Sequence, residues 1–200
     1  MSISKDEIRR LLIKLSKKSL QNFARVELKS KSSELSFNII MRIVCSKRYF
    51  GLDEDEEHHE AKLFRDLIEE AFKYAGASNP GDFLPLLMLI DYQNYGLIEE
   101  HRGHNKDSNT MIDHMLSLQQ SQPEYYTNEI IKGITMALLN AGTGTSALTM
   151  EWALSRFLNN PEVLEKARAE LETQVGTDRI IEEHGLANLF YLHNIILETF

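Results

Sequence analysis

The chain has 200 residues, and its 22 Lys and Arg against 30 Asp and Glu give a formal net charge of −8. Hydrophobic residues make up 42% and charged residues 26% of the sequence, a balance typical of globular proteins. This acidic balance argues against nucleic acid as a partner, because phosphate contacts need clustered Lys and Arg. The single cysteine, Cys45, excludes a disulfide framework and a cysteine-rich zinc site.

Helical periodicity begins at the N-terminus, where apolar residues between Ile8 and Phe23 recur at i, i+3, i+4 and i+7. Basic residues occupy the opposite face of this predicted helix: Arg9, Arg10, Lys14, Lys17 and Lys18. Two interpretations of that face remain open, a solvated surface or a patch that docks a partner through its charge.

The next elements are also predicted from periodicity and breaker residues. We expect helices over 35–44, 61–75 and 111–118, a turn over 76–82, a short apolar segment over 83–91, and a mostly polar loop around a short helical piece over 91–109. Ser32 or Ser33 is the predicted N-cap of the helix over 35–44. Pro123 follows the helix over 111–118, which must end before it.

The longest predicted helix starts after Tyr125-Tyr126, with Thr127 as its N-cap. It continues for about thirty residues, or ~45 Å, enough to cross a whole domain. Asn160-Pro161 predicts the start of another helix that runs through Leu171, and a last helical stretch covers 189–197. No alternating strand pattern is found, so the sequence predicts an all-α fold.

The middle of the long helix, Ala141-Gly142-Thr143-Gly144-Thr145-Ser146, is its weakest part, because each mid-helix glycine costs about 1 kcal/mol relative to alanine. One interpretation is a continuous helix whose backbone lies close to a flat ligand, or whose Thr hydroxyl holds water in an opened groove. The other is a turn between two ordinary helices. The residue pattern alone leaves both open.

This segment resembles the oxygen-activation motif of the cytochrome P-450 haem-thiolate monooxygenases. Flanking segments stand at the offsets of plant members: Asn109–His114, Ser121–Tyr126, Glu151–Ala153 and Asn160–Leu164. The likeness covers essentially the whole chain and is strongest to the plant group of isoflavone 2′-hydroxylase-like enzymes. It implies the helical core portion of the P-450 fold, with one long central helix and without the haem-ligand loop.

The resemblance also implies roles for individual residues. Ala141 and Gly142 match cofactor-binding positions, where the helix backbone passes over the haem and leaves room for dioxygen. Thr145 matches the catalytic alcohol that helps to deliver protons for O–O cleavage, and Glu198 matches the first residue of a Glu-x-x-Arg ion pair. The residues that match the wall of the substrate pocket are Met136, Ala137 and Asn140.

Three departures from the family pattern limit these expectations. The acid that precedes the threonine in the family is Gly144 here, and glycine supplies no proton-carrying group. The sequence ends at Phe200, before the family's thiolate loop, and Cys45 lies in a segment without that loop's glycines. The family's membrane anchor and sheet region precede Met1, and some helix is missing after Gly96. We therefore expect a single partial domain over 1–200, the middle segment of a P-450.

Two functions of different classes follow. By resemblance, the enzyme is a haem-dependent monooxygenase that hydroxylates a small, flavonoid-like plant metabolite with O₂ and electrons from an NADPH-dependent cytochrome P-450 reductase at the endoplasmic reticulum. The alternative is a catalytically inactive truncated product or a helical interaction fragment. The 200 residues alone, without thiolate or anchor, are expected to be inactive, soluble and cytoplasmic, with exposed apolar patches that favour aggregation.

Other sites have weaker support. His58-His59 lies in an acidic run, and adjacent helical histidines diverge too far to chelate a metal ion. Asp113-His114 has no serine partner for a hydrolase triad, and Gly142-Thr143-Gly144 lacks the lysine and the strand of a phosphate loop. We therefore expect no protein-held metal site.

Overall fold

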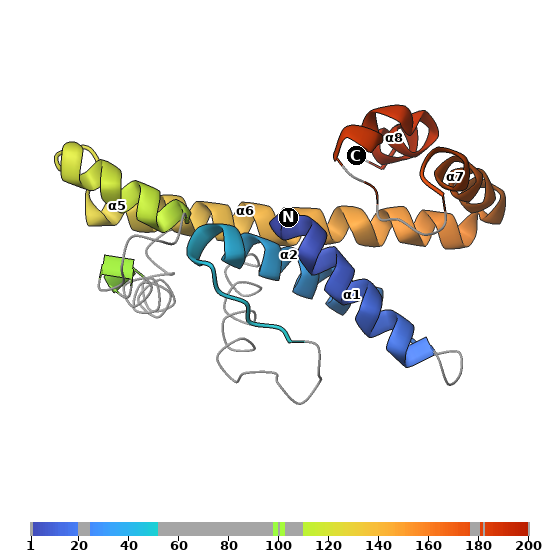
Figure 1. Cartoon of the computed structure of the whole chain (residues 1–200), viewed down its shortest axis with the longest axis horizontal. Coiled ribbons are helices and arrows are strands. Elements are labelled where there is room, and N and C mark those ends of the chain that lie inside the picture. Colours follow the sequence, from blue (N-terminus) through green and yellow to red (C-terminus); the bar gives the residue numbers. More distant parts are fainter. Residues whose placement is uncertain are drawn as a thin grey trace, which may run out of the picture. The chain divides into compact units, whose positions relative to one another are not determined.

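The computed structural model of the chain describes residues 2–19, 25–51, 98–99, 101–102, 110–176, 181 and 183–199. The elements with described bounds are all helices (Figure 1). They are α1 (Ile3–Ser19), α2 (Leu28–Cys45), α5 (Met111–Ser121), α6 (Asn128–Asn159), α7 (Pro161–Gln174), the 3-10 helix η3 (Glu183–Asn188) and α8 (Phe190–Leu197). Over these residues the predicted all-α class is confirmed. The helix expected over 61–75, the turn over 76–82 and the segment 83–91 lie outside them.

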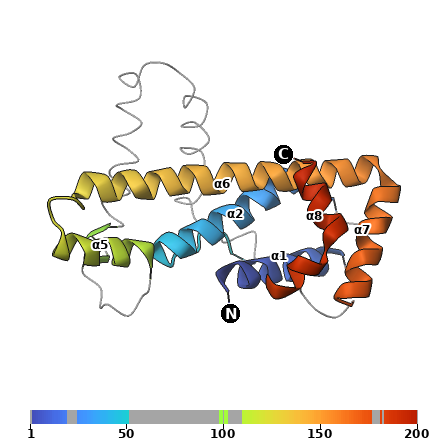
Figure 2. The ribbon, with the colours of Figure 1, turned by 90° about the horizontal axis from the view of Figure 1, so that it is seen from above.

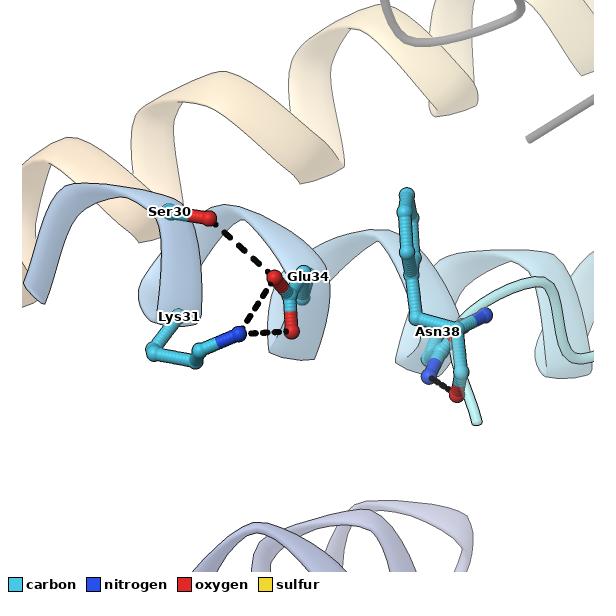
Figure 3. Close-up of polar contacts among 5 residues, drawn as sticks. Ser30, Lys31, Glu34 and Asn38 are labelled. Atoms are coloured by element: carbon cyan, nitrogen blue, oxygen red, sulfur yellow. Dashed lines mark hydrogen bonds and ion pairs between the residues drawn. The ribbon is translucent and has the colours of Figure 1, made fainter. Parts of the chain in front are cut away.

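Helix α2 starts earlier than predicted. Ser32 and Ser33 lie inside the helix, so the prediction that one of them is its N-cap is wrong. The early turns are supported by Glu34, whose carboxylate accepts hydrogen bonds from Lys31 Nζ at 2.7 Å and from Ser30 Oγ at 3.1 Å (Figure 3). Such i, i+3 and i, i+4 pairs stabilise the N-terminal part of a helix.

Buried Asn38 fixes the chain that follows α2. Its Nδ2 donates to the Phe50 carbonyl at 2.9 Å, and its Oδ1 accepts from the backbone N–H groups of Tyr49 and Phe50 at 3.2 and 3.1 Å. The rings of Tyr49 and Phe50 pack edge-on against Phe37, with centroids 5.6 and 5.5 Å away. Polar and aromatic contacts therefore bring residues 49–50 back onto α2.

A hydrophobic core gathers around these residues. Its buried members are Phe37, Met41, Val44, Cys45, Tyr49, Phe50, Ile98, Ile112, Met115, Ile131 and Leu139. They come from α2, the chain at 49–50 that follows it, α5, α6 and the short helical piece at 98–99. The sequence predicts this short helical piece within the loop over 91–109. The core therefore joins segments that are far apart in the sequence.

The ends of α5 and α6 follow the capping residues. Thr110 and Asp113 form a capping box at the start of α5, which ends at Ser121, ahead of Pro123 as predicted. Thr127 Oγ1 accepts from the Ile130 N–H at 3.3 Å, which confirms Thr127 as the cap of α6. Arg102 links the end of α5 to the start of α6. Its guanidinium donates to Gln119 Oε1 at 2.9 Å and also contacts Asn128 Oδ1.

The chain divides into two compact units, one of residues 1–35 and 145–200 and the other of residues 36–144. Within the first unit, α7 and α8 lie side by side (Figure 2). Glu170 of α7 connects them, since its two carboxylate oxygens accept the backbone N–H groups of Tyr191 and Leu192 at 2.8 and 2.9 Å. The expectation of one partial domain over 1–200 stays a prediction.

Candidate functional site

Helix α6 is continuous through the glycine-containing segment 141–146 (Figure 1). It comprises 32 residues, or about 48 Å at 1.5 Å per residue, as expected for the long central helix. The interpretation of this segment as a turn between two helices is wrong. The penalty of two glycines is outweighed by the helix on both sides of them.

One face of α6 carries small exposed side chains where the sequence predicts the reaction site. Ala137, Ala141 and Thr145 are all exposed, and a spacing of four residues places each about 40° from the previous one around the helix axis. This row of three residues is called the small-residue face below. The structure therefore brings the predicted catalytic Thr145 and the predicted cofactor position Ala141 onto the same side of α6.

Gly142 points to a different side of α6. A Cβ atom added at Gly142 would lie 2.5 Å from Cδ1 and 2.8 Å from Cγ1 of Ile40 in α2, so Ile40 would have to move to admit a side chain there. The structure thus shows a close approach at Gly142, but to a neighbouring helix. The role of Gly142 toward a cofactor stays a prediction, while its packing role is visible.

Asn140 and Thr143 are i, i+3 neighbours on α6, about 60° apart around the helix axis. Asn140 is half-buried and Thr143 is buried, and neither Asn140 Oδ1 nor Thr143 Oγ1 has a hydrogen-bond partner. Thr135, also buried on α6, instead donates from Oγ1 to the Ile131 carbonyl at 2.9 Å. Thr143 therefore differs from Thr135, whose hydroxyl is satisfied within the helix.

The predicted pocket-wall residues do not share one environment. Ala137 is exposed on the small-residue face, Asn140 is half-buried, and Met136 packs against the hydrophobic core. Their contact with a substrate stays a prediction.

Cys45 lies in the core at the end of α2. It is 2% exposed, and its thiol donates to the Met41 carbonyl with Sγ and O 3.1 Å apart. Burial among apolar side chains is the common environment of a structural cysteine. This agrees with its interpretation from sequence as a core residue.

The described residues contain no group of three or more His, Cys, Asp or Glu able to hold a metal ion. Asp113 serves the capping box of α5, where its carboxylate accepts from the Thr110 N–H at 3.1 Å. His58 and His59 lie outside the described residues. Within the part of the chain that was searched, no helix is long and apolar enough to cross a membrane.

Glu198 follows directly after α8, as the C-cap residue of this helix, and its side chain is exposed. The carboxylate of Glu170 holds the other end of α8, through the N–H groups of Tyr191 and Leu192. Sequence reasoning did not identify this link. A glutamate on an amphipathic helix carries no local signal that it caps a helix some twenty residues later.

Sequence reasoning also did not predict two other features, the contact between Ile40 and Gly142 and the burial of Thr143. For Gly142 a signal existed, because a mid-helix glycine indicates a close neighbour. Periodicity could not say whether that neighbour is a ligand or a helix.

Comparison with known proteins gives a family match over the whole chain. The model of the family described as cytochrome P-450 matches residues 1–200. Cytochrome P-450 81Q32 of Catharanthus roseus is 59% identical, over 100% of this chain and 43% of the relative. Isoflavone 2′-hydroxylase of Glycyrrhiza echinata is 47% identical, over 98% of this chain and 43% of the relative. Isoflavone 3′-hydroxylase of Medicago truncatula is 45% identical, over 100% of this chain and 44% of the relative.

The chain thus spans less than half the length of these curated relatives. The alignment with the Catharanthus roseus protein extends over 216 positions, more than the 200 residues of this chain. That relative therefore has residues without a counterpart here. Their predicted place, after Gly96, stays a prediction.

The fold has a solved counterpart in the crystal structure of the cytochrome P-450DA heme domain. The TM-score is 0.77 at 18% sequence identity, and the match covers 98% of this chain and 44% of that chain. This similarity confirms the helical portion of that fold, including the long central helix. At this identity it carries no residue roles.

Proposed function

The chain belongs to the cytochrome P-450 family, and from that premise we propose that the protein is a haem-dependent monooxygenase. Its substrate would be a small, flavonoid-like plant metabolite, hydroxylated with O₂ and with electrons from an NADPH-dependent cytochrome P-450 reductase. Relatives named isoflavone 2′- and 3′-hydroxylase support the substrate class. The observation that carries the proposal is the small-residue face, which runs from Ala137 to Thr145 on a continuous α6.

The small-residue face fits a flat ligand. Ala137 and Ala141 are exposed and bear only a methyl group, so a planar ring can approach the helix at these two positions. Met136 is less available to contact such a ring, because its side chain packs against the hydrophobic core. When bound, haem supplies the iron at which dioxygen is activated. Of the residues predicted to bind it, Ala141 fits by exposure, whereas the Cβ position of Gly142 is filled by Ile40.

Thr145 is the residue of this face that can move a proton. Its hydroxyl both donates and accepts hydrogen bonds, so Oγ1 can hold a water molecule and pass on a proton at the small-residue face. Gly144, next to it, has no carboxylate to draw water and protons to the same place. We expect proton delivery to rest on Thr145 and solvent, and a larger share of the electrons to be lost as reduced oxygen.

Cys45 does not serve as an iron ligand in this proposal. The thiolate is the form of cysteine that binds metal, and apolar burial disfavours it. Cys45 is buried in the core and donates its S–H hydrogen to the Met41 carbonyl. Since it is the single cysteine among the 200 residues, these residues alone would supply no thiolate to haem.

The second candidate function is therefore a catalytically inactive helical chain that acts, if at all, through interactions. It is favoured by the buried Cys45 and by large apolar side chains exposed on α6 and α8: Leu148, Trp152, Leu154, Leu158, Phe190 and Leu197. The two candidates differ in whether a thiolate-ligated haem forms. For the enzyme we propose residence at the endoplasmic reticulum membrane, as the family suggests.

One experiment separates the two candidates. The protein is expressed with a plant reductase, and the absorption of its reduced carbon monoxide complex is recorded to detect a thiolate-ligated haem. Isoflavone substrates are then supplied under ¹⁸O₂, and hydroxylated products are examined for one ¹⁸O atom. A thiolate spectrum together with a singly labelled product supports the monooxygenase. Absence of both supports the inactive chain, and a spectrum without isoflavone products rejects only the substrate class.

Matched variants test the residue roles. Thr145→Val removes the hydroxyl at nearly constant volume and is expected to lower product formed per NADPH about ten-fold or more. Thr149→Val is the control, because Thr149 donates to the Thr145 carbonyl at 3.0 Å on the same helix. Cys45→Ala is expected to leave the carbon monoxide spectrum unchanged, and loss of that spectrum would reject our placement of Cys45.

A further inference from the structure

Three polar side chains from separate segments meet where α5 turns into α6. Arg102 lies in the short helical piece before α5, Gln119 lies near the end of α5, and Asn128 is the first residue of α6. Arg102 Nη2 donates to Gln119 Oε1 at 2.9 Å and also contacts Asn128 Oδ1. Gln119 Nε2 donates to the same Asn128 oxygen at 3.1 Å. The three side chains therefore form a closed set of hydrogen bonds, called the Arg102 triangle below.

The Arg102 triangle assigns a partner to every hydrogen of its two donor nitrogens. Arg102 Nη2 and Gln119 Nε2 each carry two hydrogens. Arg102 Nη2 uses its two on Gln119 and Asn128, and Gln119 Nε2 uses its second one on the Tyr126 carbonyl at 2.7 Å. The bonds thus hold the backbone of the turn together with both helix ends, across 26 residues of sequence.

The segment that carries Arg102 also enters the hydrophobic core. Ile98, four residues before Arg102, is 2% exposed and shares that core with Met115 of α5 and Ile131 of α6. The segment is therefore tied to the two helices in two ways, by apolar packing at Ile98 and by hydrogen bonds at Arg102. All of these residues belong to the compact unit of residues 36–144.

The placement of the first residue of α6 is carried along the helix to the small-residue face. Helix α6 is continuous from Asn128, and Ala137 and Ala141 stand ~14 and ~20 Å further along its axis. Apolar packing beside this part of the helix is non-directional. A hydrogen bond, in contrast, weakens steeply when its length or angle changes. The Arg102 triangle therefore specifies the position of α6 more narrowly than the core does.

We propose that Arg102 is a positioning residue, which fixes the start of α6 against the end of α5 and thereby sets the place of the small-residue face. It acts through Gln119 and Asn128 and needs no contact with a substrate. The ion pair of Arg102 with Glu99 is not the cause. Its Nη1 and Oε1 atoms are 3.7 Å apart, and the side chains are 37% and 45% exposed, where such pairs contribute little. The effect on a reaction rests on the function proposed above, whereas the placement of α6 does not.

The first test measures the placement of α6 without any activity. Spin labels are attached to Ser117→Cys in α5 and Gly133→Cys in α6, both exposed positions, in a Cys45→Ala background. Electron paramagnetic resonance gives the distribution of distances between the labels. Arg102→Met keeps the apolar stem and removes the guanidinium, and it is expected to shift or broaden this distribution. A residue that served stability alone would leave the distances within the folded molecules unchanged, and that result would overturn the proposal.

Three further variants make the result specific. Glu99→Gln is the matched control, because it removes the ion pair of Arg102 and leaves the Arg102 triangle intact, and it should keep the parent distribution. Gln119→Leu should reproduce the effect of Arg102→Met. The double variant should add nothing to either single change, since both delete the same bonds. Additive changes, or an effect of Glu99→Gln as large as that of Arg102→Met, would contradict the proposal.

The second test measures the reaction with an isoflavone as the probe and a plant reductase as the electron source. Products hydroxylated at the 2′ and 3′ positions are compared between the parent and Arg102→Met, per mole of thiolate-ligated haem. Because a displaced helix presents the bound probe differently, the ratio of the two products is expected to change about three-fold or more. An equal ratio in a variant with altered label distances would overturn the effect on the reaction. A parent without the thiolate spectrum would reject the proposed function, and the label distances would still decide whether Arg102 positions α6.

Discussion

The two halves of α6 have similar apolar content and very different burial. In the first half, Ile131, Thr135 and Leu139 are completely buried. In the second half, large apolar side chains are exposed, with Trp152 at 57% and Leu158 at 69%. One continuous helix therefore changes from a core element to an element with an apolar surface within a few turns.

This difference shows that apolar residues on a helix predict a packing partner but do not identify which element that partner is. The first half packs on α2 and α5, whose residues form the core with it. The second half presents an apolar surface, as the sequence predicts for the central helix. Exposed patches of this kind on a monomer mark interaction surfaces or aggregation.

The largest predicted effect compares a leucine from each half. Leu139→Ala removes a completely buried side chain from the core and is expected to destabilise the unit of residues 36–144 by roughly 2–5 kcal/mol. Leu158→Ala removes an exposed one and should change the free energy of unfolding by less than about 0.5 kcal/mol. Hydrogen exchange of α2 and α6 peptides measures both. Comparable losses would mean that Leu158 is buried in solution.

The second prediction compares two asparagines. Asn38→Ala deletes three hydrogen bonds to buried backbone groups of residues 49–50, at a cost of roughly 3 kcal/mol. Exchange of peptides from residues 36–51 should accelerate strongly. Asn159→Ala, on the exposed end of α6, deletes one bond to the Ser155 carbonyl and should cost less than about 0.5 kcal/mol. Weak acceleration in Asn38→Ala would show that residues 49–50 do not depend on Asn38.

The third prediction compares Gly133 and Gly142, two glycines in the first half of α6, of which only Gly142 has another helix packed against it. Gly142→Ala gains helix propensity but forces Cβ into Ile40, and we expect a net loss of about 1–2 kcal/mol. Gly133→Ala meets nothing within 4 Å and should stabilise α6 by up to about 1 kcal/mol.

Denaturant unfolding followed by circular dichroism measures both glycine variants. Ile40→Ala provides the space that the Cβ atom at 142 needs, so it should remove most of the difference between Gly142→Ala and its parent. If Gly142→Ala is as stabilising as Gly133→Ala, Ile40 moves aside at no cost. The packing explanation of Gly142 would then be wrong.

Much of the fold could be predicted from sequence because its signals are local. Thr127 as a cap, the end of α5 before Pro123 and the start of α7 after Asn160 all follow from residues next to the boundary. At Asn160 the position was right, although its side chain bonds to the Arg156 carbonyl at 2.9 Å and does not cap α7. The start of α2 was missed because Glu34 stabilises turns that show no apolar period.

The candidate site was less predictable, because it depends on which helix lies against α6. The shared face of Ala137, Ala141 and Thr145 follows from spacing alone. The orientation of Gly142 toward Ile40 depends on the position of α2, which no local pattern encodes. Tertiary contacts therefore decide the function of the glycine and threonine positions within the motif.

The smallest predicted effect tests whether the other unit has a polar anchor of its own. The carboxylate of Glu170 accepts two N–H groups at the start of α8, where the N-cap residue, Leu189, makes no side-chain bond. Glu170→Gln replaces one of these acceptors with a donor and removes the negative charge that a helix N-terminus favours. We expect a loss of about 1 kcal/mol, seen as roughly five-fold faster exchange in α8.

Glu172→Gln is the control for Glu170→Gln, because Glu172 is an exposed glutamate on the same helix. It should leave exchange in α8 unchanged. Exchange in residues 36–45 of α2 and in the first half of α6 should stay at the parent rate in both variants, since the carboxylate of Glu170 anchors α8 within its own unit. If Glu170→Gln accelerated exchange in Asn128–Gly144 as well, the two units would unfold together. The contrast between the halves of α6 would then be one of exposure and not of stability.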